Sequence, residues 1–374
     1  MGNIEERLKE AAAGLTIPGF VAAATRDGER ICDLAVGQRP DAVFLIASMT
    51  KAITAVAAMQ LVEAGKVGLD EPLGPILPLL DRVQVLDGFA PDETPILRAP
   101  KRPVTLAHLL THTSGYGYSL WNAEIGRYLA KTGVPDVGSG LNAALELPLL
   151  FDPGERWEYG VGIDIAGKLI EAIGGQSLDA YFTEHIFAPL GMADTGFRLT
   201  QAIRARLAPM NTRTPEGAIA PIDFGMPSEP EFWGGGGGLF STAGDYLAFL
   251  NAILDGGVGP HGRILKAETV KRMAAHRIGP IPVRRLPTAM PALTNDLDLG
   301  FDGAEWALSF LVNPGPGRHG RAEGSLAWAG LFNTYYWADP AHRVAGVLMT
   351  QLLPFADPQV LALFETFERA VYDA

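Results

Sequence analysis

Two residues with complementary chemistry stand three positions apart near the start of the chain. Ser48 and Lys51 lie in the apolar run 44–59, and we predict a helix that carries both residues and ends near residue 64. At this spacing two side chains share one helix face, so the lysine can reach the serine hydroxyl. A serine hydroxyl becomes a useful nucleophile when a neighbouring group accepts its proton as it attacks. The pair therefore predicts a nucleophile that is activated without histidine.

The lysine can accept that proton only when it is neutral. Its apolar neighbours would bury the helix and disfavour the ammonium by desolvation. These neighbours are Phe44, Leu45, Ile46, Ala47, Ala52, Ile53, Val56 and Ala57. Because Ser-x-x-Lys also occurs by chance in many helices, the rest of the chain has to supply the context.

The composition favours a compact globular enzyme. The chain has 374 residues, of which 48% are hydrophobic and 19% charged, so it can bury a large core. A net charge of -12 disfavours nucleic acid as a partner, since phosphate binding needs clustered Lys and Arg. The sequence contains no apolar run near the roughly 20 residues of a membrane span and no secretory pattern at its start. We therefore expect a cytoplasmic protein that binds neither nucleic acid nor membrane, with its oligomeric state left open.

Strand-like segments gather at the two ends of the chain. Two apolar runs joined at Asp27-Gly28 predict a hairpin, because Asp-Gly favours tight hairpin turns. Near the C-terminus, runs that alternate with turns predict an antiparallel meander followed by a final helix. The hairpin runs are 19–25 and 30–36, the later runs are 306–312, 325–329, 333–337 and 344–351, and the final helix is about 359–372.

The middle of the chain has helical patterns instead. Residues 160–173 carry apolar side chains at helical spacing, directly after Tyr159, which is well placed to project into a cleft. We therefore predict an α/β (α+β) fold, with an antiparallel sheet flanked by helices. Residues 1–75 and 232–374 would form the sheet domain, and residues 76–231 an inserted, mostly helical domain with active-site loops.

Several other chemistries are disfavoured. The run 234–238 is all glycine but lacks the Lys-Ser/Thr ending of a phosphate loop, so close backbone approach at a strand or bulge is the better interpretation. The seven histidines are dispersed without metal-ligand spacing, and no Gly-x-Ser-x-Gly elbow occurs. The single cysteine, Cys32, fits a small buried residue with no redox role. We expect neither a metal nor a cofactor.

Four motifs follow one another in a specific order. They are Ser48-Met-Thr-Lys51, Leu110-Thr-His-Thr-Ser-Gly115, Phe151-Asp-Pro-Gly-Glu-Arg-Trp-Glu-Tyr159 and Trp328-Ala-Gly330. With them the chain resembles the serine β-lactamase and penicillin-binding-protein-like superfamily over almost its whole length. Within that superfamily it looks most like the family VIII carboxylesterases, which are similar to class C β-lactamases.

The resemblance implies a role for each matched residue. Ser48 would be the nucleophile that becomes acylated, and Lys51 and Tyr159 would act as one coupled pair that moves its proton. Which of these two is the general base stays open. The oxyanion hole would consist of the backbone N–H groups of Ser48 and Leu331. His112, within the second motif, is expected to be a hydrogen-bonded turn residue rather than a base.

Two departures from the β-lactamase pattern bear on the substrate. Trp328-Ala-Gly330 resembles the Trp-Gly-Gly version of the esterases, where β-lactamases carry a cation that holds the substrate carboxylate. Tyr159-Gly-Val161 replaces Tyr-x-Asn, so the amide that binds a β-lactam side chain is missing. Trp328, Gly330 and Val161 are accordingly expected to bind the substrate. The resemblance implies a small-molecule ester as substrate, with β-lactam hydrolysis at most a weak side activity.

The sequence thus predicts a serine carboxylesterase that cleaves esters, with short-chain esters preferred, through an acyl-enzyme on Ser48. The alternatives on the same scaffold are a β-lactamase or D-amino-acid peptidase, an amide hydrolase, and an acyltransferase that delivers the acyl group to an alcohol. A non-enzymatic binding protein is disfavoured, because Ser48, Lys51 and Tyr159 are all present.

Overall fold

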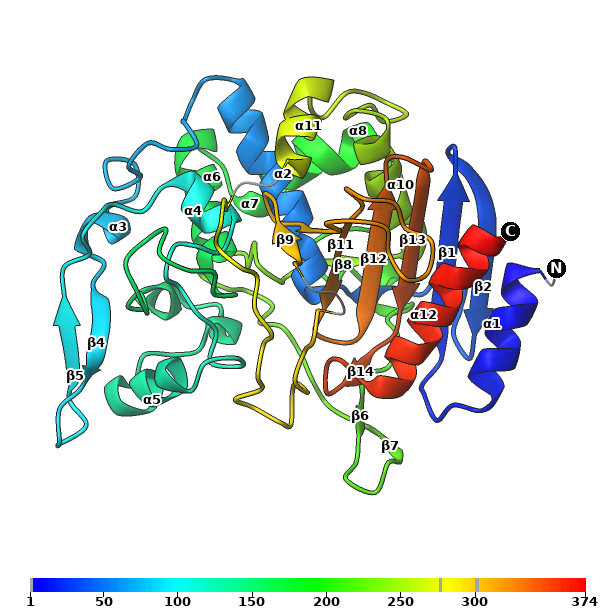
Figure 1. The fold of residues 1–374 in the computed structure, drawn as a ribbon, viewed down its shortest axis with the longest axis horizontal. Coiled ribbons are helices and arrows are strands. Elements are labelled where there is room, and N and C mark those ends of the chain that lie inside the picture. Colours follow the sequence, from blue (N-terminus) through cyan, green and yellow to red (C-terminus); the bar gives the residue numbers. More distant parts are fainter. Residues whose placement is uncertain (1–2, 276–277, 300–302) are drawn as a thin grey trace.

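The fold consists of an antiparallel sheet with helices packed around it. The computed structural model describes residues 3–275, 278–299 and 303–374. Within these ranges one large sheet has the strand order β2-β1-β13-β12-β11-β10-β9 (Figure 1). Its strands are β1 Phe20–Arg26, β2 Glu29–Val36, β9 Glu305–Trp306, β10 Leu311–Val312, β11 Leu326–Gly330, β12 Thr334–Asp339 and β13 Val344–Met349. The predicted fold class, an antiparallel sheet flanked by helices, is confirmed.

The two ends of the chain meet in this sheet. The predicted hairpin of β1 and β2 is confirmed, and β1 pairs antiparallel with β13, with Val21 opposite Met349. The predicted meander is also confirmed, with one correction. The expected strand 306–312 is two short strands, because Ser309 has a φ of 67° and reverses the chain between β9 and β10.

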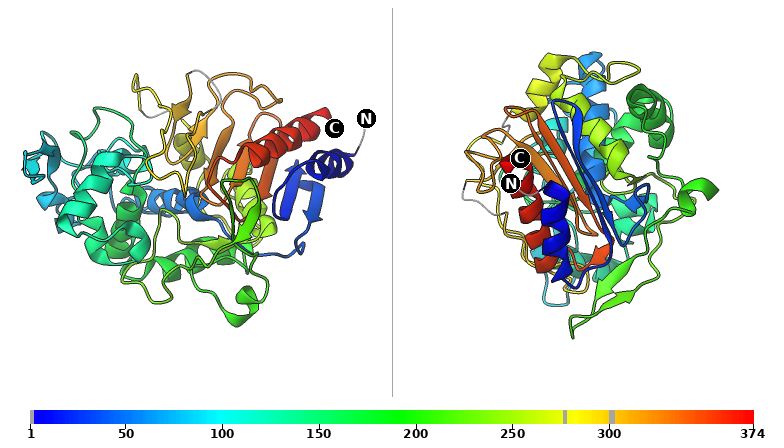
Figure 2. Two further views of the ribbon diagram at one scale, coloured as in Figure 1. Left: turned by 90° about the horizontal axis from the view of Figure 1, so that it is seen from below. Right: turned by 90° about the vertical axis from the view of Figure 1, so that its right-hand side faces the viewer.

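Helices cover both faces of the sheet. The first and last helices, α1 Ile4–Ala13 and α12 Pro358–Asp373, pack against each other along one face (Figure 2). On the other face α10 Ala243–Leu254 contacts β1, β12 and β13. All six residues of β13 are therefore buried, as in a strand with both faces covered. Cys32, on β2, is buried as expected, and burial raises the pKa of its thiol to about 12.

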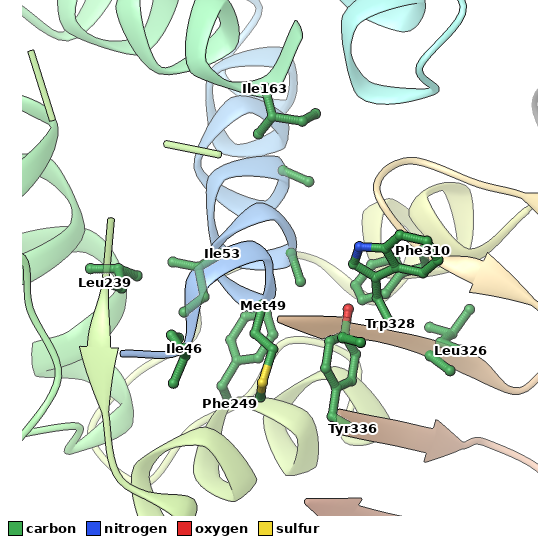
Figure 3. Close-up of a cluster of buried hydrophobic side chains, with 14 of the residues drawn as sticks. Ile46, Met49, Ile53, Ile163, Leu239, Phe249, Phe310, Leu326, Trp328 and Tyr336 are labelled. Carbon is green, nitrogen blue, oxygen red and sulfur yellow. The ribbon is translucent and has the colours of Figure 1, made fainter. Parts of the chain in front are cut away.

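A buried helix runs through the centre of the molecule. Every residue from Thr50 to Met59 of α2 Thr50–Glu63 is buried, as expected for a helix that is apolar on all sides. A 3₁₀ turn, η1 Ala47–Met49, precedes it, so the predicted helix begins as a tighter turn that carries Ser48. α6 Gly162–Gly174 packs against α2. Figure 3 shows apolar side chains from η1, α2, α6, α10 and the sheet packed along η1 and α2.

Short elements make up the region that we predicted as an inserted domain. Besides α6, its helices and turns are α3 Pro78–Arg82, α4 Leu106–Leu110, α5 Ala123–Thr132, η2 Val137–Ser139, η3 Asn142–Leu145, α7 Leu178–Phe182, η4 Thr183–Phe187, α8 Ala188–Leu190 and α9 Gln201–Arg204. Its strands are β4 Val85–Phe89, β5 Pro95–Arg98, β6 Asn211–Arg213 and β7 Ile219–Pro221. β6 pairs with β14 Leu352–Leu353, so this region also contacts the C-terminal part. The domain boundaries at 75/76 and 231/232 stay a prediction.

The remaining elements complete the surroundings of α2. β3 Phe44–Leu45 pairs with β8 Phe240–Ser241 just before the Ser48 turn, and α11 Ala267–Ala274 contacts α2. Of the helices in the described ranges, none is both long and apolar enough to cross a membrane.

Candidate active site

A strained turn presents Ser48 to a cavity. Ala47, directly before it, has a φ of 43°, in the left-handed region that costs a non-glycine residue about 1–3 kcal/mol. The turn is held from two sides. The Tyr246 hydroxyl donates a hydrogen bond to the Met49 carbonyl oxygen at 2.8 Å, and the Leu239 N–H donates to Thr50 Oγ1 at 3.2 Å. The surrounding structure thus fixes the backbone around Ser48.

Lys51 lies buried behind this serine. Its side chain is 1% exposed, and Nζ donates to Ser48 Oγ at 3.0 Å, to Tyr118 Oη at 3.2 Å and to the Gly236 carbonyl oxygen at 2.5 Å. Nζ also lies 4.8 Å from the centre of the Tyr159 ring, a cation–π geometry. The serine and lysine that share one helix face in the sequence are therefore in direct contact.

Tyr159 approaches the pair with its ring rather than with its hydroxyl. Its Oη accepts a hydrogen bond from Trp328 Nε1 at 2.9 Å, which joins the third and fourth sequence motifs. The His112 ring packs against it with a centroid distance of 4.6 Å. Tyr159 and Lys51 are thus neighbours, while the phenol that is hydrogen-bonded to Lys51 is Tyr118.

Tyr118 and Asp164 belong to the site, and sequence reasoning missed both. The Tyr118 hydroxyl donates to Asp164 Oδ2 at 3.3 Å, and the Gly236 N–H donates to Asp164 Oδ1 at 2.8 Å. Burial, and after it the Asp164 carboxylate, raises the pKa of Tyr118 well above its ordinary value, so this phenol stays protonated at neutral pH. Two signals could have found them. Tyr118 stands three residues after Gly115, and Asp164 is the one acid in the otherwise apolar segment 160–167.

His112 has the role of a turn residue. It is 1% exposed and has a φ of 56°, and its Nδ1 accepts a hydrogen bond from the Gly160 N–H at 3.4 Å. Burial, followed by the charge of Lys51, lowers the pKa of His112 well below its ordinary value, so the ring stays neutral. It supports the segment that carries Tyr159.

The glycine run forms a turn against α2 and α6. The Thr54 hydroxyl donates to the Gly235 carbonyl oxygen at 2.6 Å. A Cβ at position 236 would lie 2.3 Å from Asp164 Oδ2 and 2.8 Å from Tyr118 Oη, so only glycine fits there. The predicted close backbone approach is confirmed, although the run is a turn rather than a strand.

Gly330 brings the fourth sequence motif, on β11, against the Ser48 turn. A Cβ on it would lie 2.2 Å from the Ile46 carbonyl oxygen, so the glycine allows β11 to approach η1. Ser48, Gly330 and the next residue, Leu331, line the same cavity of about 240 Å³. Both residues of the predicted oxyanion hole therefore line this cavity, and the pairing of their N–H groups stays a prediction.

This cavity is mainly apolar. Besides Ser48, Tyr118, Tyr159 and Trp328, its walls carry Leu120, Trp121, Phe224, Met226, Leu286, Leu293, Leu297, Phe332 and Phe355. Its acidic residues are Asp136 and Asp164, and among the described residues that line it there is no Lys, Arg or His.

Val161 is the one predicted substrate-binding residue that the structure places elsewhere. It is 1% exposed, precedes α6 and packs in the hydrophobic core, outside the described cavity wall. The physical reason is that the helix starts directly after Val161 and turns this apolar side chain inward. Val161 would affect the choice of substrate because position 161 lacks an amide side chain, and not because Val161 contacts the substrate.

Comparisons with known proteins find similarity along most of the chain. Acyltransferase calJ from Penicillium decumbens is 31% identical over 348 residues, which cover 88% of this chain and 81% of that protein. Lovastatin esterase from Penicillium rubens is 33% identical over 349 residues, covering 90% and 86% of the two chains. The unliganded simvastatin synthase (LovD) from Aspergillus terreus has a TM-score of 0.81 at 29% identity, covering 99% of this chain and 97% of that one.

A fourth similarity concerns the fold alone. EstCE1, described as a hydrolase with promiscuous acyltransferase activity, has a TM-score of 0.76 at 23% identity and covers 99% of this chain and 98% of its own. The family comparison extends over nearly the whole sequence, since residues 4–367 match the Beta-lactamase family. With its Ser-x-x-Lys pair in contact inside the fold that these proteins share, the chain belongs to the Beta-lactamase family.

Proposed function

We propose that the protein is a serine esterase that forms an acyl-enzyme on Ser48. The observation that carries this proposal is the 3.0 Å contact between Lys51 Nζ and Ser48 Oγ at the wall of an apolar cavity. A buried amine that touches a hydroxyl is the arrangement that nucleophilic catalysis requires of a base and a serine. The relatives named as an esterase and as acyltransferases support a reaction that passes through an acyl group on the enzyme.

The reaction follows from the positions of these groups. Ser48 Oγ attacks the ester carbonyl carbon while its proton moves to Lys51, and the carbonyl oxygen becomes an anion held by the N–H groups of Ser48 and Leu331. The C–O bond to the alcohol then breaks, and the leaving oxygen takes the proton that Lys51 accepted from Ser48. The bond from Trp328 does not consume the O–H of Tyr159, which can donate to this leaving oxygen. Water attacks the acyl-enzyme by the same steps in reverse and releases the acid.

The cavity favours an uncharged, apolar carboxylic ester. Trp328 stands where a cation would hold a substrate carboxylate, and the described lining carries two acidic residues and no basic one. An anionic β-lactam would enter this cavity without a partner for its charge, which is costly in an apolar site. This specificity corresponds to that of a family VIII carboxylesterase.

Acyl transfer to an alcohol is the second candidate. The sequence relatives include proteins named as acyltransferases, and the mainly apolar walls of the cavity would favour an apolar alcohol over water as the acceptor. In that case the same acyl-enzyme would react with a hydroxyl of a second substrate. Hydrolysis and transfer would differ only in whether water or an alcohol attacks the acyl-enzyme.

Substrate comparison tests these assignments. Short-chain p-nitrophenyl esters should have a kcat/KM roughly 10- to 100-fold above that of a chromogenic cephalosporin, the range expected from one missing charge-assisted hydrogen bond. Faster turnover of the cephalosporin would contradict the specificity argument. Adding an apolar alcohol and quantifying new ester against free acid measures the balance between transfer and hydrolysis. Predominant formation of the new ester would identify an acyltransferase.

The hydroxyl of Tyr159 should matter for the chemical step. Tyr159→Phe keeps the ring against Lys51 and His112 but removes the O–H, so we expect kcat to fall roughly 100-fold with little change in KM. Stopped-flow release of p-nitrophenol measures the acylation rate directly. The matched control is Tyr128→Phe on α5. Tyr128 is not among the described residues that line the cavity, so this change should leave the rate unaltered. Near wild-type acylation in Tyr159→Phe would remove this residue from the mechanism.

A further inference from the structure

The hydrogen bonds of Lys51 are completely assigned. An ammonium group has three N–H donors, and Nζ has three acceptors in contact, namely Ser48 Oγ, Tyr118 Oη and the Gly236 carbonyl oxygen. When Lys51 is the neutral base, it keeps two N–H groups and gains one lone pair. One of the three partners must then donate to nitrogen instead of accepting from it.

Asp164 restricts which partner that can be. A carbonyl oxygen never donates, so Gly236 stays an acceptor. Tyr118 has a single hydroxyl proton, and this proton points to Asp164 Oδ2 at 3.3 Å. The Tyr118 oxygen can therefore only accept from Lys51. The lone pair of the neutral amine is left facing Ser48, whose proton it has to take.

We propose that Asp164 is a positioning residue that directs the proton exchange of Lys51 to Ser48. It acts through two groups, holding the Tyr118 hydroxyl proton with Oδ2 and the Gly236 N–H with Oδ1, at 3.3 Å and 2.8 Å. Gly236 thus bonds to both groups: its N–H donates to the Asp164 carboxylate, and its carbonyl oxygen accepts from Lys51. The proposal rests on the proposed function, because it presumes that Ser48 is the nucleophile.

The arrangement requires Asp164 to be ionised, so the activity should depend on pH. A protonated carboxyl offers a donor where one of its two oxygens now accepts, so either Tyr118 or Gly236 loses its acceptor. Burial raises the pKa of Asp164, opposed by the charge of Lys51, the Gly236 N–H and the Tyr118 hydroxyl. The other titratable groups that face this network are Asp136, which acts on Tyr118, and Tyr159 and His112, which lie beside Lys51.

The raised pKa of Asp164 determines how the activity changes with pH. Activity should be present while Asp164 is a carboxylate and should be lost as the pH falls through its pKa. Because that pKa is raised, the acid limb of kcat should lie above the value of about 3.9 that is usual for aspartate.

Asp164→Asn is the direct test, since an amide has nearly the same shape but only one acceptor oxygen. We expect kcat on a p-nitrophenyl ester to fall roughly 100-fold, the order of loss caused by a misplaced catalytic group, with KM nearly unchanged and the acid limb removed. Tyr118→Phe removes the hydroxyl that donates to Asp164 and should lower kcat similarly. Because both changes break one relay, the double variant should be little worse than either single variant.

Three results would overturn the inference. They are a wild-type kcat and acid limb in Asp164→Asn, an unchanged kcat in Tyr118→Phe, or fully additive losses in the double variant. If Asp164→Asn fails to fold, as judged by thermal unfolding, the kcat of Tyr118→Phe decides. Wild-type protein treated with a fluorophosphonate tests the underlying function separately. A wild type without an adduct on Ser48 defeats the proposed function, whereas a labelled wild type with an unaffected Asp164→Asn defeats only the role of Asp164.

Discussion

Ser48→Ala is expected to abolish ester hydrolysis while the protein stays folded. No other group can form the acyl bond from this position, so kcat should fall on the order of 10⁴-fold or more, as it does when a serine hydrolase loses its nucleophile. The fold should persist, because Ser48 is half-buried and the strained turn is held by Tyr246 and Leu239 through the neighbouring residues. Mass spectrometry of the fluorophosphonate-treated protein should show one adduct in the wild type and none in the variant.

A matched serine variant makes this test specific. Ser177 caps α7 with its side chain and lies outside the described cavity wall. Ser177→Ala removes a serine hydroxyl at a cost of about 1 kcal/mol in stability but should leave the labelling and kcat unchanged. Peptide mapping that located the adduct on a residue other than Ser48, or a labelled Ser48→Ala protein, would contradict the assignment of the nucleophile.

Lys51→Met should have the second-largest effect. Methionine has a similar length and keeps the site filled, but it can neither accept the serine proton nor donate to Tyr118 and Gly236. Loss of a positioned general base lowers the rate about 10²- to 10⁴-fold, and we expect kcat to fall by this amount. The Gly236 carbonyl and the Asp164 carboxylate also lose their cation, so thermal unfolding should be measured alongside the kinetics.

Lys51→Arg separates the two contributions of the lysine. Arginine keeps a cation near Tyr118 and Tyr159 but has no lone pair to offer, since guanidinium is not deprotonated in proteins. We therefore expect no recovery of acylation relative to Lys51→Met. Recovery towards the wild-type rate would show that the charge of Lys51 is sufficient and that another group accepts the proton. Lys168→Met on α6, which breaks only the ion pair with Glu171, is the control for the loss of a lysine.

The sequence was sufficient where the determining interactions are local. Ser48 and Lys51 are three residues apart, so helical geometry alone brings Nζ to the hydroxyl, and the structure has them 3.0 Å apart. The apolar residues around them correctly predicted that Lys51 would be buried. The hairpin at Asp27-Gly28 was predictable for the same reason, because two turn residues set the pairing of β1 with β2.

Only the tertiary structure determined which groups surround that pair. Tyr118, Asp164 and Gly236 stand 67, 113 and 185 residues from Lys51, with the contacts to Tyr118 and Gly236 made through long-range packing. No periodicity encodes distances of this kind, so the sequence could indicate Tyr159 as a neighbour of Lys51 but not that its ring, rather than its hydroxyl, faces the amine. Val161 shows the same limit, since the direction of its side chain was settled by where α6 begins. Local spacing thus determined the nucleophile and its lysine, and the packing of α2, α6, the glycine turn and β11 determined how their proton can move.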